Sequence, residues 1–202
     1  MRRKLVTIEK TFIIIKPDGI ARGIAGRIFQ RFEEAGFKLV AARMILATKE
    51  QAAEHYPGDN KKWLENLGNK TMKNYGGDIE GVKRDYGATD KVEIGKKIYN
   101  RMIEYISSTP IIIMVWEGNH AVERIRTLVG STVPTFAEVG SIRGSYAVDT
   151  PALASQSGRI AFKTIVHTSD CVEEAQREIK IWFKGNYKVL DAYERIDYVD
   201  IL

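Results

Sequence analysis

Two kinds of hydrophobic pattern alternate along the chain. Short runs dense in apolar and β-branched residues predict strands, and these runs occupy 11–16, 37–47, 111–116 and 165–167. Between the runs, apolar residues recur at the spacing of one helix face. This spacing predicts helices over 26–35, 49–55, 96–107 and 121–129, and a last helix that begins near residue 170.

Residues at the ends of these segments support the predicted helices. Thr48 precedes one of them and Gln51 follows three residues later, which is the spacing of a capping box. Asp170 and Glu173 repeat that spacing at the last helix. Gly130 stands directly after another predicted helix, where a helix-ending glycine is expected.

Four other stretches carry no sustained periodicity. The sequence at 17–19, Pro-Asp-Gly, predicts a turn after the first strand. The stretch 57–90 is polar, rich in glycine, asparagine, lysine and aspartate, and only partly periodic. We expect 131–144 to be a loop and 150–158 to be a second irregular stretch.

The order of these elements predicts the fold class. If the helices between residues 48 and 107 are additions, the remaining order is βαββαβ. This order predicts a ferredoxin-like sandwich, an α/β (α+β) fold whose helices cover one face of the sheet, with a helical insertion. The 202 residues suit a single domain. Because such sandwiches carry many activities, the fold alone does not predict the function.

Composition narrows the class of protein. The chain is 44% hydrophobic and 28% charged, as in ordinary globular proteins. No apolar run approaches the ~20 residues that cross a bilayer, so we expect no membrane association. The net charge of +5 suits an anionic partner, but the basic residues are scattered, so we do not expect nucleic acid. One cysteine, Cys171, predicts a reducing, cytoplasmic location.

Candidate chemistry centres on three histidines. His55 falls on a short polar helix and His120 in a loop, so a surface or helix-end role is the simpler interpretation of both. His167 ends an apolar strand just before the last predicted helix. A histidine there can be held by the backbone while one ring edge opens into a cleft, although the residues alone still favour a structural role.

The order of several short segments strengthens the functional interpretation of His167. They occupy 11–19 with its Lys-Pro-Asp-Gly turn, 22–26, 36–38, 54–56, 115–118, 129–134, 142–144, 167–170 and 178–179. In this order they resemble the nucleoside diphosphate kinase family. The resemblance covers the chain from about residue 10 to about residue 183, apart from two interruptions.

The resemblance implies an enzyme that moves the γ-phosphate of a nucleoside triphosphate to a nucleoside diphosphate through phospho-His167. Ping-pong kinetics, Mg²⁺ bound with the nucleotide and a homo-oligomer, a hexamer or smaller, are implied with it. Glu178 matches the carboxylate that orients the catalytic ring, and Lys16 the lysine at the ribose hydroxyl and γ-phosphate. The phosphate-side contacts are matched by Tyr56, Arg126, Thr132 and Arg143. Trp63 is the candidate for stacking on the base, with Leu64 as the rival alignment.

Elementary chemistry agrees with this set of residues. A neutral imidazole is a nucleophile near pH 7, and a hydrogen bond at one ring nitrogen leaves the other free. Phosphoryl transfer needs mainly alignment and positive charge around the transferred oxygens. Each residue judged singly also has a simpler explanation: Lys16 as a strand end, for example, or Glu178 as a surface carboxylate.

The sequence departs from the family pattern in several places. Thr164 stands where the family has an asparagine at the ribose, and Thr168 where it has a small residue. The family's Ala-Pro-Gly reads Glu-Val-Gly at 138–140. Insertions at about 57–109 and 150–163 resemble a longer, archaeal-type form of the family.

These departures keep two rivals open. The first is a nucleotide-binding family member with weak or lost kinase activity, which Thr164 and Thr168 favour. The second is a ferredoxin-like nucleic-acid binder, which the lack of a base-stacking sheet motif disfavours.

Overall fold

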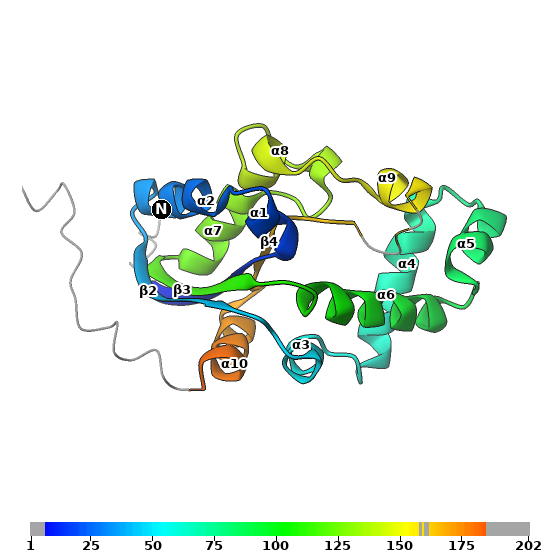
Figure 1. Cartoon of the computed structure of the whole chain (residues 1–202), viewed down its shortest axis with the longest axis horizontal. Coiled ribbons are helices and arrows are strands. Elements are labelled where there is room, and N and C mark those ends of the chain that lie inside the picture. The colour runs from blue at the N-terminus through cyan, green and yellow to red at the C-terminus, as the bar shows by residue number, and fades with distance from the viewer. Residues whose placement is uncertain (1–6, 158, 160–161, 185–202) are drawn as a thin grey trace, which may run out of the picture.

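The computed structural model of the chain contains a four-stranded antiparallel sheet with strand order β2-β3-β1-β4 (Figure 1). It describes residues 7–157, 159 and 162–184. The strands are β1 Ile8–Ile15, β2 Lys38–Ile45, β3 Ile111–Asn119 and β4 Val166–Thr168. With α2 Ala25–Glu34 and α7 Ala121–Val129 between the strands, the core order is βαββαβ, so the predicted ferredoxin-like fold is confirmed, and α10 Val172–Phe183 follows the last strand.

The register of the central strand β1 brings distant parts of the chain together. β1 pairs with β3 from Ile8 opposite Asn119 to Ile15 opposite Ile112. On its other edge, Ile14 lies opposite His167 of β4. Lys16 follows directly after β1, and β1 is the direct neighbour of β4, which carries His167.

The helices account for most of the remaining described chain. They are α1 Pro17–Ala21, α2 Ala25–Glu34, α3 Lys49–His55, α4 Lys61–Asn74, α5 Ile79–Tyr86, α6 Lys91–Ile106, α7 Ala121–Val129, the 3₁₀ helix η1 Pro134–Phe136, α8 Ile142–Tyr146, α9 Pro151–Gln156 and α10 Val172–Phe183. None of these described helices is long and apolar enough to cross a membrane.

Helices cover both faces of the sheet, where the sequence predicted one face only. Phe12 and Ile14 of β1 point into a core shared with α3 and α10, while Ile13 and Ile15 point into a core shared with α2 and α7. All four side chains have no exposed surface. A strand that is apolar on both faces has to be covered on both faces. Helix α10, which follows the last strand, covers the face with Phe12 and Ile14.

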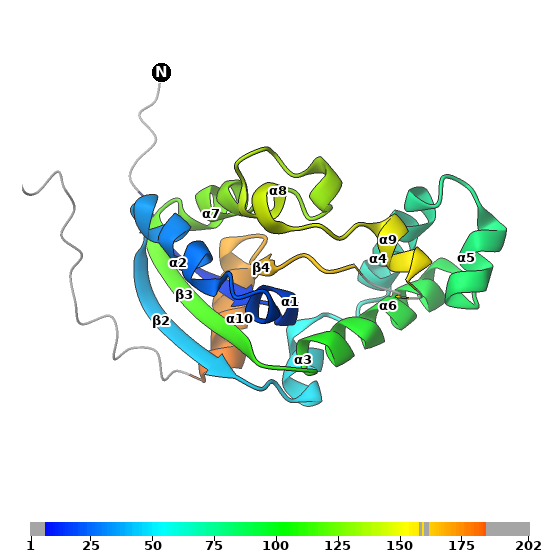
Figure 2. The ribbon, with the colours of Figure 1, turned by 45° about the horizontal axis from the view of Figure 1, so that its top comes forward.

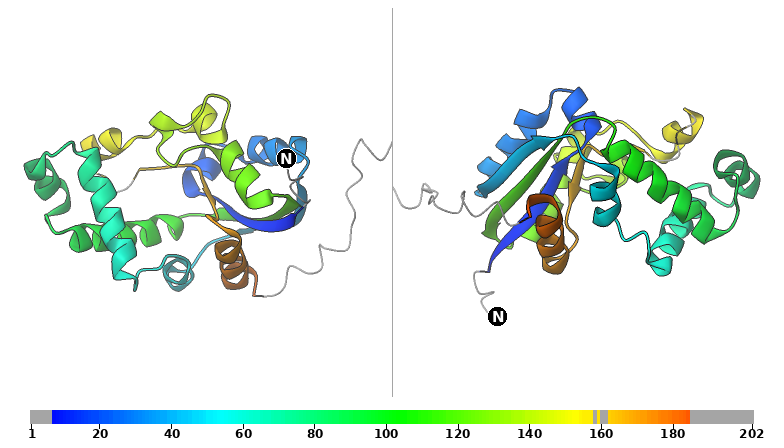
Figure 3. Two further views of the ribbon diagram at one scale, coloured as in Figure 1. Left: turned by 180° about the vertical axis from the view of Figure 1, so that it is seen from behind. Right: turned by 60° about the horizontal axis from the view of Figure 1, so that its bottom comes forward.

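The polar stretch 57–90 is helical, which corrects the sequence interpretation. Figure 2 and Figure 3 show α4 and α5 beside α6 at one end of the molecule. Asn60 and Asp78 cap the two missed helices by accepting hydrogen bonds from backbone N–H groups. A small cluster that includes Val82 and Ile94 holds them together. That 57–109 and 150–163 are insertions into one domain stays a prediction, and 158, 160 and 161 lie outside the described residues.

Local boundaries differ from the predictions at several points. The turn predicted at 17–19 is the start of α1, with Pro17 at a position that tolerates its missing N–H. The loop predicted over 131–144 contains η1 and the start of α8, and 150–158 contains α9. At α3, Thr48 and Gln51 form the predicted capping box.

The capping box predicted at the last helix is wrong. Helix α10 begins at Val172 with Cys171 as its N-cap, and no side chain caps it. The carboxylate of Asp170 is instead paired with Arg126 of α7, so it is not available to the helix terminus.

Candidate active site

All nine predicted site residues line one open cavity of about 1020 Å³. It lies between β4, α7, the loop that follows α7, and the helices α3, α4 and α10. The nine residues are Lys16, Tyr56, Trp63, Arg126, Thr132, Arg143, Thr164, His167 and Glu178. They come from segments spread over more than 160 positions of the chain, from residue 16 to residue 178.

His167 is bonded to a buried carboxylate. Its Nε2 lies 2.8 Å from Oε1 of Glu178, whose side chain is 4% exposed. The second carboxylate oxygen accepts a 2.6 Å hydrogen bond from the hydroxyl of Ser169. Ser169 is itself bonded to the backbone of Phe12 in β1. Glu178 is therefore fixed at both oxygens before anything binds in the cavity.

This bond decides which nitrogen of His167 is free. A carboxylate accepts hydrogen bonds, so Nε2 carries the proton and Nδ1 keeps its lone pair. Burial, reinforced by the positive charges of Lys16 and Arg143, lowers the pKa of His167 from 6.5 to about 3. The ring is consequently neutral and nucleophilic at physiological pH.

His55 belongs to the site, which the sequence interpretation missed. It ends α3 as expected, but it is 1% exposed and its ring packs edge-on against that of His167, with centroids 4.5 Å apart. Its Nδ1 accepts a 3.2 Å hydrogen bond from Nε1 of Trp182 and lies 3.5 Å from Oε1 of Glu178. Burial lowers the pKa of His55 well below 6.5, so it is neutral.

Arg177 was also missed. It donates to the backbone oxygens of Glu54 and His55, at 3.1 and 2.8 Å, and so ties the end of α3 to α10. The only sequence signal for this region was the segment 54–56, which resembles the family; nothing local marked His55 as buried.

Positive charge gathers on the side of the cavity near β4. Lys16 Nζ donates a 2.9 Å hydrogen bond to Oγ1 of Thr164. Burial, with Arg143 nearby, lowers the pKa of Lys16 from 10.5 to about 8. Arg143 is 6% exposed and donates hydrogen bonds to the backbone oxygens of Thr164, Val166 and Gly130. It therefore stabilises the backbone at β4 and also adds a positive charge to the cavity.

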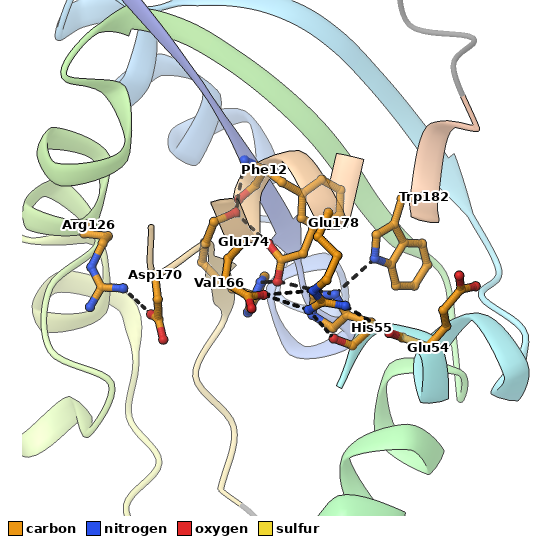
Figure 4. Close-up of polar contacts among 12 residues, drawn as sticks. Phe12, Glu54, His55, Arg126, Val166, Asp170, Glu174, Glu178 and Trp182 are labelled. Carbon is orange, nitrogen blue, oxygen red and sulfur yellow. Dashed lines mark hydrogen bonds and ion pairs between the residues drawn. The ribbon is translucent and has the colours of Figure 1, made fainter. Parts of the chain in front are cut away.

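An ion pair also lines the cavity. Arg126 of α7 is paired with Asp170, and Figure 4 shows the two side chains extending toward each other. Both are substantially exposed, which makes the pair weak and easily exchanged for an anionic ligand. Thr132 lies exposed in the loop that follows α7.

The far end of the cavity is aromatic. The ring of Tyr56 is buried and lies nearly parallel to that of Trp63, at 6.4 Å between centroids and 25° between planes. Trp63, Leu67 and Met102 line this end, whereas Leu64, the rival of Trp63, is buried in its helix. A flat apolar wall opposite a cluster of cations suits a ligand with an aromatic part and an anionic part.

Comparison with known proteins agrees with this chemistry. The sequence model of the family described as nucleoside diphosphate kinase matches residues 9–75 and 80–187. A nucleoside diphosphate kinase of Pyrobaculum aerophilum is 44% identical over 177 residues, covering 88% of this chain and 96% of that protein. One of Crocosphaera subtropica is 35% identical over 187 residues, covering 93% and 94% of the two chains.

Solved structures give the same result. The crystal structure of an NDP kinase from Pyrobaculum aerophilum superimposes with a TM-score of 0.83 at 41% identity, over 90% of this chain and 98% of that chain. A transition-state mimic of nucleoside-diphosphate kinase from Borrelia burgdorferi, with bound vanadate and ADP, gives a TM-score of 0.71 at 29% identity over 94% of each chain. The chain belongs to the nucleoside diphosphate kinase family.

Proposed function

We propose that His167 takes the γ-phosphoryl group of a nucleoside triphosphate on Nδ1 and passes it to a nucleoside diphosphate in the same cavity. The chain is a nucleoside diphosphate kinase, an enzyme that transfers phosphate between nucleotides. The observation that carries the proposal is the 2.8 Å bond from Nε2 of His167 to the buried Glu178, because it leaves Nδ1 as the nucleophile.

The reaction follows from that arrangement in two half-steps. The Nδ1 lone pair attacks the γ-phosphorus, the bond to the β,γ-bridging oxygen breaks, and the diphosphate leaves with that electron pair. Nε2 keeps its proton, and Glu178 stabilises the positive charge that develops on the ring. In the second half-step a terminal oxygen of another diphosphate attacks the phosphorus, and the P–N electron pair returns to Nδ1.

The other cavity residues position the nucleotide and neutralise its charge. Arg126 exchanges Asp170 for phosphate oxygens, while Arg143, Thr132 and Tyr56 contribute further donors. Lys16 and Thr164, already bonded to each other, are the proposed contacts for the ribose hydroxyls, and Lys16 is also the proposed contact for the γ-phosphate. Trp63 is the proposed stacking surface for the base. These roles follow from the matched family positions and from the shared cavity.

We propose that Mg²⁺ enters with the nucleotide. Among the described residues, the one group with three possible metal ligands is His55, His167 and Glu178, two nitrogens and one carboxylate. Mg²⁺ prefers six oxygen ligands and commonly takes them from substrate phosphates and water. When bound, it would supply positive charge that offsets the negative charge of the nucleotide's phosphates.

We also propose self-association, to a hexamer or a smaller oligomer, and a cytoplasmic location. Met44 of β2, the edge strand of the described sheet, is 61% exposed, and Leu46 just after it is 64% exposed, so two large apolar side chains lie open at this side of the sheet. Light scattering after gel filtration tests the assembly, and the mass of one chain would contradict it. The single cysteine suits a reducing compartment.

One experiment tests the proposed function. The wild type and His167→Ala are mixed with γ-labelled ATP, and alkaline mass spectrometry then locates any phosphate. We expect acid-labile label on His167 that GDP discharges, and no label in the variant. Label that persists in His167→Ala would contradict the mechanism. Absence of label from the wild type would favour a nucleotide-binding protein without kinase activity.

A further inference from the structure

The last turn of α6 is bonded to the first turn of α1 through one hydroxyl group. The phenol of Tyr105 donates a 2.6 Å hydrogen bond to Oδ1 of Asp18. The hydroxyl oxygen of Tyr105 in turn accepts a 3.0 Å hydrogen bond from the backbone N–H of Asp18. Because both bonds end on one residue, they fix the side chain of Asp18 relative to its own backbone.

The second oxygen of Asp18 holds a backbone turn. Oδ2 accepts a 3.0 Å hydrogen bond from the N–H of Ile165. Ile165 has φ +65°, a left-handed conformation that a β-branched side chain strongly disfavours. The N–H of Val166 reaches back to the oxygen of Thr164 at 2.6 Å, which makes this the rarer, strained form of the γ-turn. Such a turn persists only where its surroundings hold it.

This strained turn stands between residues that we assign to the site. Thr164, on one side of it, accepts the hydrogen bond of the Lys16 ammonium. The backbone oxygen of Ile165 accepts a 2.7 Å bond from the backbone N–H of Lys16. His167 follows two positions later on β4, beside α1 in Figure 2. The backbone of Ile165 therefore sets the direction in which Thr164 faces Lys16.

We propose that Tyr105 is a positioning residue for phosphoryl transfer: its hydroxyl fixes Asp18, Asp18 holds the left-handed Ile165, and Ile165 aims Thr164 at Lys16. This inference rests on the function proposed above. These hydrogen bonds link the long helical segment α4 to α6 to the end of the cavity proposed to bind the ribose. They are separate from the aromatic wall that the same segment contributes to the cavity.

The chemistry of this connection suits a permanent support. Burial and the adjacent Asp18 raise the pKa of Tyr105, so the hydroxyl remains a hydrogen-bond donor throughout the physiological range. Asp18 is 8% exposed, and its carboxylate has the hydroxyl of Tyr105 on one oxygen and the N–H of Ile165 on the other. Without the hydroxyl, Oδ1 of Asp18 and the backbone N–H of Asp18 both lose their hydrogen-bond partner.

Tyr105→Phe tests the proposal because it removes the hydroxyl and keeps the ring. The measurement is the single-turnover rate of His167 phosphorylation by ATP and by 2′,3′-dideoxy-ATP, which lacks the ribose hydroxyls. With ATP we expect a loss of about tenfold, the size expected for one charge-assisted hydrogen bond. With the dideoxy nucleotide we expect at most about a twofold loss, because the affected contact is not made there.

Tyr75→Phe is the matched control. Tyr75 donates a 2.6 Å hydrogen bond to Asp85, the same pair of groups at the same distance, between α4 and α5 rather than next to α1. The rates of Tyr75→Phe with both nucleotides should equal those of the wild type. Asp18→Asn should change the ratio of the two rates in the same direction as Tyr105→Phe, and the double variant should show little further change.

Two outcomes would overturn the proposal. An equal loss with both nucleotides would mean that Tyr105 supports the fold in general, and an unchanged rate with ATP would mean that the hydroxyl positions nothing. If Tyr105→Phe loses its near-UV circular dichroism, Asp18→Asn decides by the same ratio. Failure of the proposed function is distinguishable, because the wild type itself would then remain unlabelled.

Discussion

Replacing Thr164 by valine removes the acceptor of the Lys16 ammonium. The two groups are 2.9 Å apart, and Thr164 is only 4% exposed, so water cannot readily take the place of the lost oxygen. Valine keeps the branched shape of threonine, and the surrounding packing is therefore expected to survive.

The size of the effect follows from the charge of the partner. A hydrogen bond to a charged group contributes about 1.5–3 kcal/mol, against about 1 kcal/mol between neutral groups. At about 1.4 kcal/mol per factor of ten, we expect kcat/KM of Thr164→Val to fall roughly ten- to a hundredfold. A bond between two neutral groups, about 0.5–1.5 kcal/mol, would give only about a two- to twelvefold loss.

A change in the pH profile should accompany this loss. Burial and Arg143 already lower the pKa of Lys16 to about 8, and the charged form is the one that binds phosphate. Without its acceptor, the ammonium is less stable and its pKa falls further. The decline of kcat/KM as pH rises through that pKa should therefore begin at lower pH in Thr164→Val than in the wild type.

The assay is steady-state ATP-dependent phosphorylation of GDP between pH 6 and pH 9, about one unit or more on each side of the decline. Thr164→Ser keeps the hydroxyl and serves as the control, and Thr164→Asn restores the residue usual in the family and should keep or raise kcat/KM. Equal kcat/KM values for wild type and Thr164→Val, with the same alkaline decline, would refute the reasoning. Thr164 would then have only a structural role in the segment before β4.

Two further predictions concern the nucleophile and the packing of α1. Burial and neighbouring cations lower the pKa of His167 to about 3. Its ring resonances, followed by NMR in the free enzyme, should therefore not titrate between pH 5 and pH 8, roughly the range in which an ordinary histidine titrates. A titration midpoint near 6.5 would contradict this. Gly19→Ala would place a Cβ 2.8 Å from Cγ2 of Ile15, and we expect a loss of about 1–3 kcal/mol in the free energy of unfolding measured with urea. Gly26→Ala, on α2 with no atom within 4 Å of the added carbon, is the control, and equal stability of the two variants would refute the packing argument.

The strands and the core helices could be predicted because their pattern is local. The run Phe12 to Ile15 and the Thr48 capping box determine their own structure within a few residues. The pairing of His167 with Glu178, which we propose as the catalytic pair, was predicted from family positions, since nothing near Glu178 distinguishes it from Glu173 or Glu174 in the sequence. Its burial depends on β1 and Ser169, which are brought to it by the fold.

What the sequence did not reveal depends on contacts between distant segments. His55 looks like a surface residue in its own helix, and its burial is created by Trp182 and His167, more than 110 positions away. The helices α4 and α5 were missed because few of their residues are apolar, and they bury those few mainly against α6. Asp170 was assigned to a helix cap because its ion pair with Arg126 has no local signature.

The neighbouring strands β2 and β3 are joined by a connection that contains α3, α4, α5 and α6. The entropy lost when such a connection closes grows only with the logarithm of its length, so doubling the length costs about 0.6 kcal/mol. A segment that forms its own small core at Val82 and Ile94 can offset this cost. Lengthening the chain at this point is therefore nearly neutral for folding, although it adds both an aromatic wall and a hydrogen-bonded support to the catalytic cavity.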